Sequence, residues 1–160
     1  MAATPITRTD RFFAKRRSRI VFCATLANKN SPTRSEINAG TDLTGEISQV
    51  NGFNTTSNLL DAPDYGSPFT SKTPGAIEAA DSSFQCYQDK TTHDIRELLP
   101  RDTTGFVIIM WGGDVPGQLC DVFPVTVSST PKSLPDNAAA DITINFAITS
   151  EPAEDVVIPA

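Results

Sequence analysis

The chain has 160 residues, of which 39% are hydrophobic and 20% are charged, and its formal net charge is −6. This length suits one domain, and the acidic balance argues against general nucleic-acid binding, which needs Lys and Arg to neutralise phosphates. The longest strongly apolar run covers only residues 106–111, far short of the roughly 20 residues of a membrane-spanning helix. Residues 1–13 contain no apolar stretch behind a basic start, so we expect no secretory signal and no membrane partner.

A basic arm is expected at the N-terminus, over residues 1–19. These residues hold six basic side chains against one acidic one, a charge of +5, whereas residues 20–160 hold seven basic and eighteen acidic residues, a charge of −11. Such asymmetry is typical of an arm that docks on another acidic surface, and the alternative is a solvated terminus without a role in assembly. The basic residues of the arm are Arg8, Arg11, Lys15, Arg16, Arg17 and Arg19.

The body, residues 20–160, is predicted to be a single mainly β domain, α+β in detail. Apolar and polar residues alternate, or apolar residues run continuously, over a series of short segments bounded by turn residues. The predicted strands are residues 19–27, 46–53, 57–61, 81–89, 105–112, 119–128 and 140–149.

Three of these strands carry specific expectations. Residues 105–112 are apolar on both faces, which indicates a central strand covered on both sides. Residues 140–149 alternate most regularly, which is typical of a strand with one buried face. Within residues 119–128, Pro124 lacks an N–H and is therefore expected at a sheet edge or a bulge.

The predicted core collects the side chains on the apolar faces of these strands and of one short helix. Its members are Phe22, Phe84, Ile95, Leu98, Ile108, Phe123, Val125, Ile142, Ile144, Phe146 and Ile148.

Two short helices are predicted from start and stop signals. Residues 92–99 form a flanking helix, with Asp94 in the first turn and Pro100 directly after the end. Residues 31–40 form one helical turn, with Ser31 as the N-cap. Two other segments show little periodicity. One is a long turn-rich loop over residues 59–75, of a length that is usually functional, and the other is a C-terminal arm over about residues 150–160.

Residues that carry catalytic or metal chemistry are scarce. The chain has one His and three Cys without a CxxC spacing, which argues against a zinc or redox site. His93 lies beside Asp94, but no Ser or Cys in a recognisable nucleophile motif accompanies it. The glycine-rich residues 112–117 join two strands, whereas a phosphate-binding loop opens onto a helix. We therefore expect no enzyme activity, no metal and no cofactor.

The chain resembles the tail tube (major tail) proteins of long-tailed bacteriophages over most of its length, from about residue 33 onward, and is most similar to those of actinobacterial phages. The most specific pieces are PDYGSPFTSKTPG, DSSFQCYQD, IRELLP, GDVPGQLCDVFPV and the ending FAITSEPAEDVVIPA. None of them is a catalytic signature, so the resemblance implies a structural role.

The resemblance implies a β-sandwich or partly closed barrel flanked by a helix, in a subunit that forms hexameric rings. Such rings stack into a hollow tube in the virion tail, which is assembled in the cytoplasm of the bacterial host. The implied partners are further copies of the chain, the tape-measure protein, other tail proteins, and viral DNA that passes through the lumen without specific binding. Residues 104–112, 119–128 and 140–149 are then expected among the strands that line the lumen.

Inter-subunit contacts are expected from the basic arm and from the turn-rich loop. The candidate residues are Arg8, Arg11, Lys15, Arg16, Arg17, Asp64, Tyr65, Phe69 and Lys72. The residues also leave open two other classes of protein. One is another virion β-domain, such as a tail-terminator or head–tail joining protein. The other is a carbohydrate- or protein-binding β-sandwich, in which Tyr65 and Phe69 would form the aromatic cluster.

Overall fold

The computed structural model describes residue 3, residues 5–91 and residues 94–160. The helices are α1 (Ala14–Arg17), α2 (Arg34–Ala39) and α3 (Asp94–Leu98), and the strands are β1 (Arg19–Cys23), β2 (Thr41–Asp42), β3 (Ile47–Asn51), β4 (Thr55–Ala62), β5 (Ser71–Ala79), β6 (Ser82–Tyr87), β7 (Thr104–Met110), β8 (Leu119–Ser129), β9 (Lys132–Ser133), β10 (Asp141–Ile148) and β11 (Ala153–Val157). The prediction of a mainly β fold with a short flanking helix is confirmed. No helix in the described part of the chain is long and apolar enough to cross a membrane.

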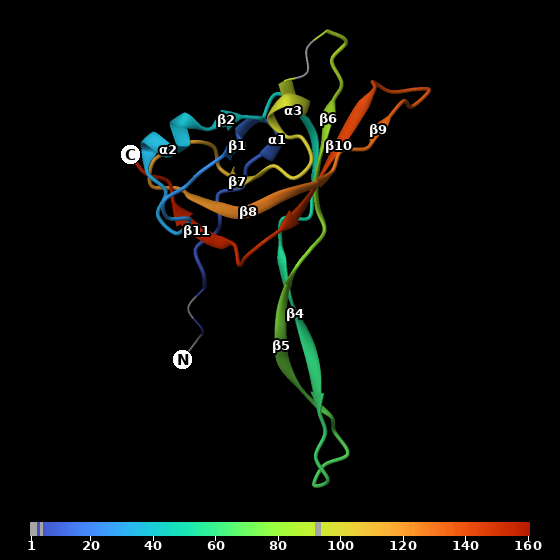
Figure 1. Ribbon diagram of the computed structural model, residues 1–160. Helices are drawn as coiled ribbons and strands as arrows, with labels where there is room; N and C mark the ends of the chain where they lie inside the picture. The colour runs from blue at the N-terminus through green and yellow to red at the C-terminus, as the bar shows by residue number, and fades with distance from the viewer. Residues whose placement is uncertain (1–2, 4, 92–93) are drawn as a thin grey trace.

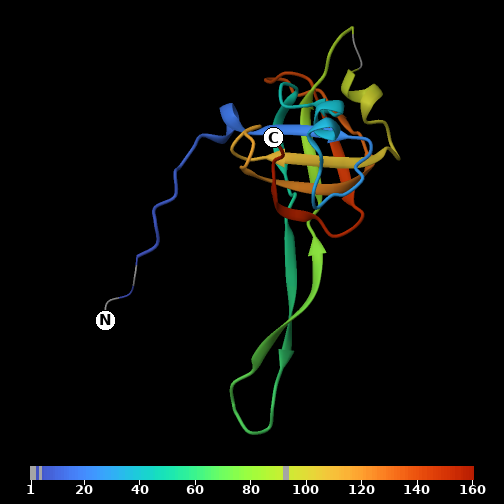
Figure 2. The ribbon, with the colours of Figure 1, turned by 90° about the vertical axis from the view of Figure 1, so that its left-hand side faces the viewer.

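One nine-stranded antiparallel sheet forms the body. Its main strand order is β2-β1-β7-β8-β10-β6-β3, with β11 paired to β8 and β9 paired to β10. In Figures 1 and 2 the strands β6 and β10 run steeply across the direction of β1, β7 and β8, so the sheet bends around its inner face. Within the described residues β2 and β3 remain as separate edges, so the barrel is not closed.

The inner face of the bent sheet encloses the main core. Alternate residues of β1, β6, β7, β8 and β10 supply it, as the period of two in a strand requires. Phe53 lies at the centre: its ring stacks on Phe84 at a centroid distance of 4.8 Å and meets Phe123 edge-on at 5.2 Å. Phe53 has a φ of 56° and follows Gly52, whose φ is 73°, so a tight turn directs this ring inward.

A second core covers the other face of the same central strands. Ile108 and Met110 of β7 and Val122 of β8 pack there with Ile37 of α2 and Ile158 near the C-terminus. β7 is therefore buried on both faces, as the continuous apolar run of residues 105–112 predicts.

All of the predicted core residues are buried except Leu98 and Ile148, which are half-buried and pack against the main core. Ile108 lies in the second core, whereas the other buried members lie in the main one.

The sequence pattern predicts an irregular C-terminal arm over about residues 150–160. This expectation is wrong, because residues 153–157 form β11 in the sheet. Val156 pairs with Cys120 of β8, with a register shift after Ala153. Asp155 sits in this irregularity with a φ of 55°. The shift interrupts the alternation, which explains why the sequence pattern did not indicate a strand.

The prediction of a long loop over residues 59–75 is also wrong, because most of these residues belong to the two strands of a hairpin. β4 and β5 pair from Thr55–Ala79 to Ala62–Ser71, and only residues 63–70 form the tip. Figure 1 shows this hairpin leaving the body as a separate two-stranded ribbon. Pro74 and Gly75 lie inside β5, and such residues are usually read as breakers rather than strand formers.

Pro124 lies in β8, which is a central strand and not an edge. Its carbonyl oxygen accepts the N–H of Thr149 at 3.0 Å, on the side where β10 pairs with residues 125–129 and β11 with residues 119–122. The missing N–H thus falls in the gap between two partner strands, where no ladder bond is lost.

The two predicted helices are present with different starts. α2 begins after Thr33 and not after Ser31: Thr33 and Glu36 form a capping box, each side chain accepting the other's backbone N–H. α3 begins at Asp94, and residues 92 and 93 of the predicted helix lie outside the described residues. Inside the expected basic arm, α1 forms one helical turn, while residues 5–13 contain no helix or strand.

Candidate assembly surfaces

The β4–β5 hairpin, residues 55–79, exposes almost every side chain. Leu59 and Ile77 remain 62% and 64% exposed although they are apolar, and neither face of the ribbon rests on the body beyond its root (Figures 1 and 2). Two-stranded hairpins in water are marginally stable by themselves. This hairpin therefore presents unpartnered apolar surface.

The hairpin tip, residues 63–70, carries two exposed aromatic side chains. Tyr65 is fully exposed and Phe69 is 74% exposed. Two local hydrogen bonds order the turn: Gly66 N–H donates to Asp64 Oδ1 at 2.8 Å, and Phe69 N–H donates to Ser67 Oγ at 3.1 Å. The tip is thus a locally ordered turn that exposes two aromatic side chains.

A single ion pair lies behind the tip. Lys72 of β5 meets Asp61 of β4 at 2.5 Å, across the antiparallel pair that joins these residues. The charge of Lys72 is therefore offset within the hairpin. Among the described residues no cation lies within ion-pair distance of Asp64.

The basic N-terminal segment is exposed throughout its described part. Ile6 and Phe13 have no cover from the body, and Figure 2 shows residues 5–13 running away from it. Further in, α1 carries Lys15, Arg16 and Arg17 in its single turn. In the described part of the chain none of these three makes an ion pair.

An apolar groove, hereafter the α1 groove, lies between α1 and the edge strand β3. Its volume is about 640 Å³. The floor is formed by Ile20, Ile47, Val50 and Ile109, and the rim by Lys15, Tyr87 and Trp111.

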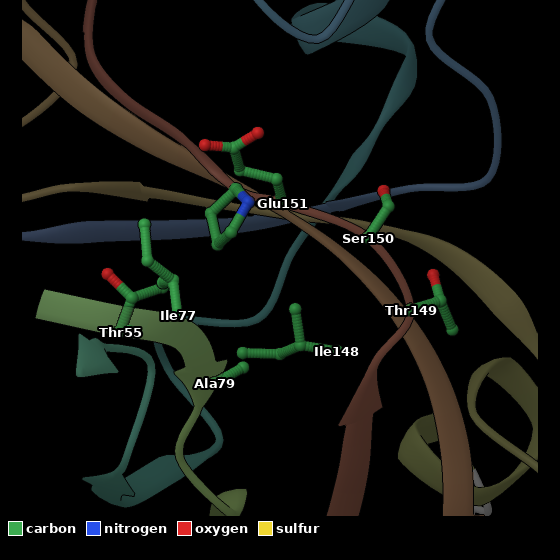
Figure 3. Close-up of a pocket in the computed structure, with 9 residues that line it drawn as sticks. Thr55, Ile77, Ala79, Ile148, Thr149, Ser150 and Glu151 are labelled. Carbon is green, nitrogen blue, oxygen red and sulfur yellow. The ribbon is translucent and has the colours of Figure 1, made fainter. Parts of the chain in front are cut away.

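A second pocket, of about 570 Å³, lies at the root of the hairpin. Figure 3 shows Ile77 and Ala79 of β5 facing Ile148 and the connection that follows it, with Glu151 above them. Thr55 Oγ1 donates to Glu154 at 3.0 Å, which ties β4 to β11. The root of the hairpin is thus hydrogen-bonded to the body.

The outer face of β3, β6 and β10 is polar and almost uncharged. Gln49, Asn51, Ser83, Gln85, Thr143 and Asn145 lie on it, opposite the main core. Several of these side chains are joined by hydrogen bonds: Gln85 donates to Asp141, and Asn145 donates to Ser129 at 2.9 Å. Asp141, at the start of β10, lies on the same face and carries a charge.

The α2 region is held to the body by a bidentate ion pair. Both guanidinium nitrogens of Arg34 meet the two carboxylate oxygens of Asp114 at 2.5 Å. The hydrogen bond from Arg34 lowers the pKa of the Asp114 carboxyl below its usual value. Hydrogen bonds from the Ala27 and Thr33 backbone, with that of the Thr33 hydroxyl, lower the pKa of Glu36 in the same way.

The three cysteines are buried free thiols. Burial raises the pKa of Cys86 to about 12 and that of Cys120 to about 11, and burial also raises the pKa of Cys23. Within the described residues no three His, Cys, Asp or Glu side chains are grouped so that they could hold a metal ion. His93 lies outside the described residues.

The structure divides the predicted contact residues between three places. Asp64, Tyr65 and Phe69 lie at the hairpin tip, and Lys72 lies one ion pair behind it; Lys15, Arg16 and Arg17 lie on α1, whereas Arg8 and Arg11 lie in the extended segment. The α1 groove was missed by sequence reasoning. Its rim combines Tyr87 and Trp111 from segments far apart in the sequence, and only the bend of the sheet brings them together.

The fold is similar to that of chains in solved contractile injection systems and in a prophage baseplate. A chain of the sheath/tube terminator of an extracellular contractile injection system, PVC, superposes with a TM-score of 0.62 at 10% identity, covering 91% of this chain and 97% of that one. A chain of the anti-feeding prophage (AFP) baseplate gives 0.57 at 10% identity, with 94% and 95% covered. A chain of the PVC sheath–tube complex in its extended state gives 0.56 at 11% identity, with 81% and 82% covered.

The family is settled by sequence. The phage tail tube protein family model matches residues 6–160, so the chain belongs to the phage tail tube proteins. It is a structural subunit of the tail tube and a component of the virion tail. No match was found among curated proteins.

Proposed function

We propose that this chain assembles with further copies of itself into rings that stack into the hollow tail tube, through which viral DNA leaves the particle. The observation that carries the proposal is the β4–β5 hairpin, whose apolar side chains have no partner within the chain. Full burial of a side chain such as Leu59 or Ile77 contributes about 1.5–3 kcal/mol. A neighbouring copy is the partner that a repeated assembly always provides.

Open sheet edges support the same proposal. β3 pairs only with β6 in the described residues, and β4 and β5 pair only with each other. Unpaired strand edges recruit further chains unless they are covered. In an assembled tube, contacts between copies cover such edges.

The lumen is proposed to face the polar outer surface of β10, β6 and β3. Of the three segments expected at the lumen, β7 and much of β8 are covered on both faces by the two cores, whereas the outer face of β10 is uncovered by either. Thr143 and Asn145 lie on this outer face of β10, and their paired positions on β6, Gln85 and Ser83, lie on the same face. Neutral side chains offer no Lys or Arg to phosphate, so DNA slides past them without being bound.

Further parts of the proposal come from the family rather than from this chain's contacts. The rings are hexameric, the tape-measure protein occupies the lumen before DNA passes, and assembly takes place in the host cytoplasm. The chain has no enzymatic role. The similarity to actinobacterial phages in particular stays a prediction.

A tail-terminator role is the second candidate, because a chain from a sheath/tube terminator shares the fold. The two roles differ in one property: a tube subunit adds ring upon ring, whereas a terminator stops at one ring. Electron micrographs of the purified full chain distinguish them. We expect tubes of varied length with a regular axial repeat, and a population of single rings alone would overturn the tube role in favour of the terminator.

A further inference from the structure

We propose that the hairpin tip of one copy docks into the α1 groove of a copy in the next ring. The proposal deepens the tube assembly proposed above and rests on it. It assigns a receptor to the aromatic tip and an occupant to the groove.

The groove suits an aromatic occupant. Its floor is made of aliphatic side chains, and its rim holds Tyr87 and Trp111, which remain 48% and 43% exposed. The indole of Trp111 is held in place by a hydrogen bond, because its Nε1 donates to Asp121 Oδ2 at 2.6 Å. A concave apolar surface with ordered aromatic walls is the kind of site that buries the anchor residues of an interface.

The tip suits such a groove. Tyr65 and Phe69 project from the same short turn, and the turn is ordered by the hydrogen bonds to Asp64 and Ser67. An ordered loop loses less conformational entropy when it binds than a disordered one. Tyr and Trp are also the residue types most enriched among the residues that dominate interface energies.

The charges of the two sites are opposite. Asp64 lies at the tip without a cation partner among the described residues, and Lys72 behind it is already paired with Asp61. Beside the groove, α1 presents Lys15, Arg16 and Arg17, which have no anionic partner in the described part of the chain. Complementary charge of this kind fixes register and excludes wrong partners.

The two sites lie at different places on the molecule. Figures 1 and 2 show the hairpin extending far beyond the body, while α1 lies on a flank of the body at a distance from the tip. A projection and a recess at different places on one chain give a head-to-tail contact, which produces an open filament where the rotation between copies does not close a ring. We assign the contact to neighbouring rings because the hairpin extends well beyond the body of its own chain.

A charge exchange tests the proposal on the full chain. Asp64→Lys and the double variant Lys15→Glu/Arg16→Glu should each reduce the fraction of protein that sediments as tubes at least several-fold. The variant that combines all three changes should restore it, because the charges again oppose each other. The matched control is Asp136→Lys, the same change at an exposed residue of the β9–β10 connection, which should sediment like the wild type.

A second experiment places the two sites together directly. In tubes, Thr70→Cys at the hairpin tip combined with Ala14→Cys on the groove-lining side of α1 should give a ladder of multimers with a short bismaleimide, while each single variant gives none. The native cysteines are buried, and the wild type reports their background.

The outcomes separate this docking from tube assembly itself. A wild type that forms no tubes overturns the proposed function. Tubes that form normally in both charge variants, or a combined variant that fails to recover, overturn the docking while leaving tube assembly intact. Absence of the cross-linked ladder in tubes overturns the docking as well.

Discussion

The side chain of Trp111 is hydrogen-bonded to the carboxylate of Asp121, and the same carboxylate also binds the backbone of β11. The indole Nε1 of Trp111, directly after β7, donates to Asp121 Oδ2 of β8 at 2.6 Å, while Asp121 Oδ1 accepts the backbone N–H of Asp155 in β11 at 2.9 Å. One side chain thereby orders the rim of the α1 groove and also the irregular turn of β11, where Asp155 has a positive φ.

Replacement of Asp121 by Ala should therefore lower the free energy of unfolding by about 1.5–3 kcal/mol, the usual contribution of hydrogen bonds to a charged group. Asp121→Asn keeps an acceptor and should lose less. Urea denaturation of the unassembled chain measures both. Equal stability of Asp121→Ala and the wild type would mean that the carboxylate does not hold β11.

Phe146→Ala should lower the free energy of unfolding by about 3–5 kcal/mol, from lost transfer energy and the cavity that remains. The Phe146 ring lies 5.0 Å from that of Phe84 and 5.8 Å from that of Phe53, measured between centroids. Ala147→Ser, at the exposed neighbouring position of β10, serves as the control and should unfold like the wild type. An unchanged melting temperature for Phe146→Ala would refute the assigned register.

Stability should fall in acid partly through the Arg34–Asp114 pair. Because the pair lowers the pKa of Asp114 in the folded state, its contribution is present above the unfolded pKa of about 3.9 and is lost as the pH falls through the folded value. The pKa of Glu36 is lowered too, so it acts in the same direction.

The urea midpoint of the unassembled chain, followed from neutral pH to below pH ~3.9, tests this contribution. Asp114→Asn should start less stable at neutral pH and lose less on acidification than the wild type. Asp136→Asn, at an exposed carboxylate, is the control and should follow the wild-type curve. Parallel curves for Asp114→Asn and the wild type would contradict the role of the ion pair.

The three thiols should resist labelling while the chain is folded. Burial keeps Cys86 and Cys120 protonated, with pKa values of about 12 and about 11, and the thiolate is the reactive form. A colorimetric disulfide reagent at pH 8 should therefore detect three thiols in denaturant and almost none without it. Rapid labelling of the native chain would show that at least one cysteine is accessible.

The body of the fold was predictable where burial imposes a simple period. Residues 140–149 alternate because β10 has one face on the main core, and residues 105–112 are continuously apolar because β7 lies between two cores. In both cases the pattern follows from the surroundings of the strand, so the sequence carries it.

The assembly surfaces were less predictable because their partners lie outside the chain. The hairpin strand β5 contains Pro74 and Gly75 and buries neither face in the body, so no alternation marks it. The α1 groove depends on the bend that brings Tyr87 near Trp111, which no local pattern encodes. The exposed aromatics Tyr65 and Phe69 could be found, but not the surface they meet.

The central claim is that another copy of the chain covers the β4–β5 hairpin, which has no partner beyond its root among the described residues of its own chain. Hydrogen exchange of the wild type, compared between the unassembled chain at low concentration and sedimented tubes, tests it most directly. We predict that amides of residues 55–79 exchange quickly in the unassembled chain and become strongly protected in tubes, while those of β7 and β8 are protected in both. Equal protection of residues 55–79 in the two states would contradict the claim.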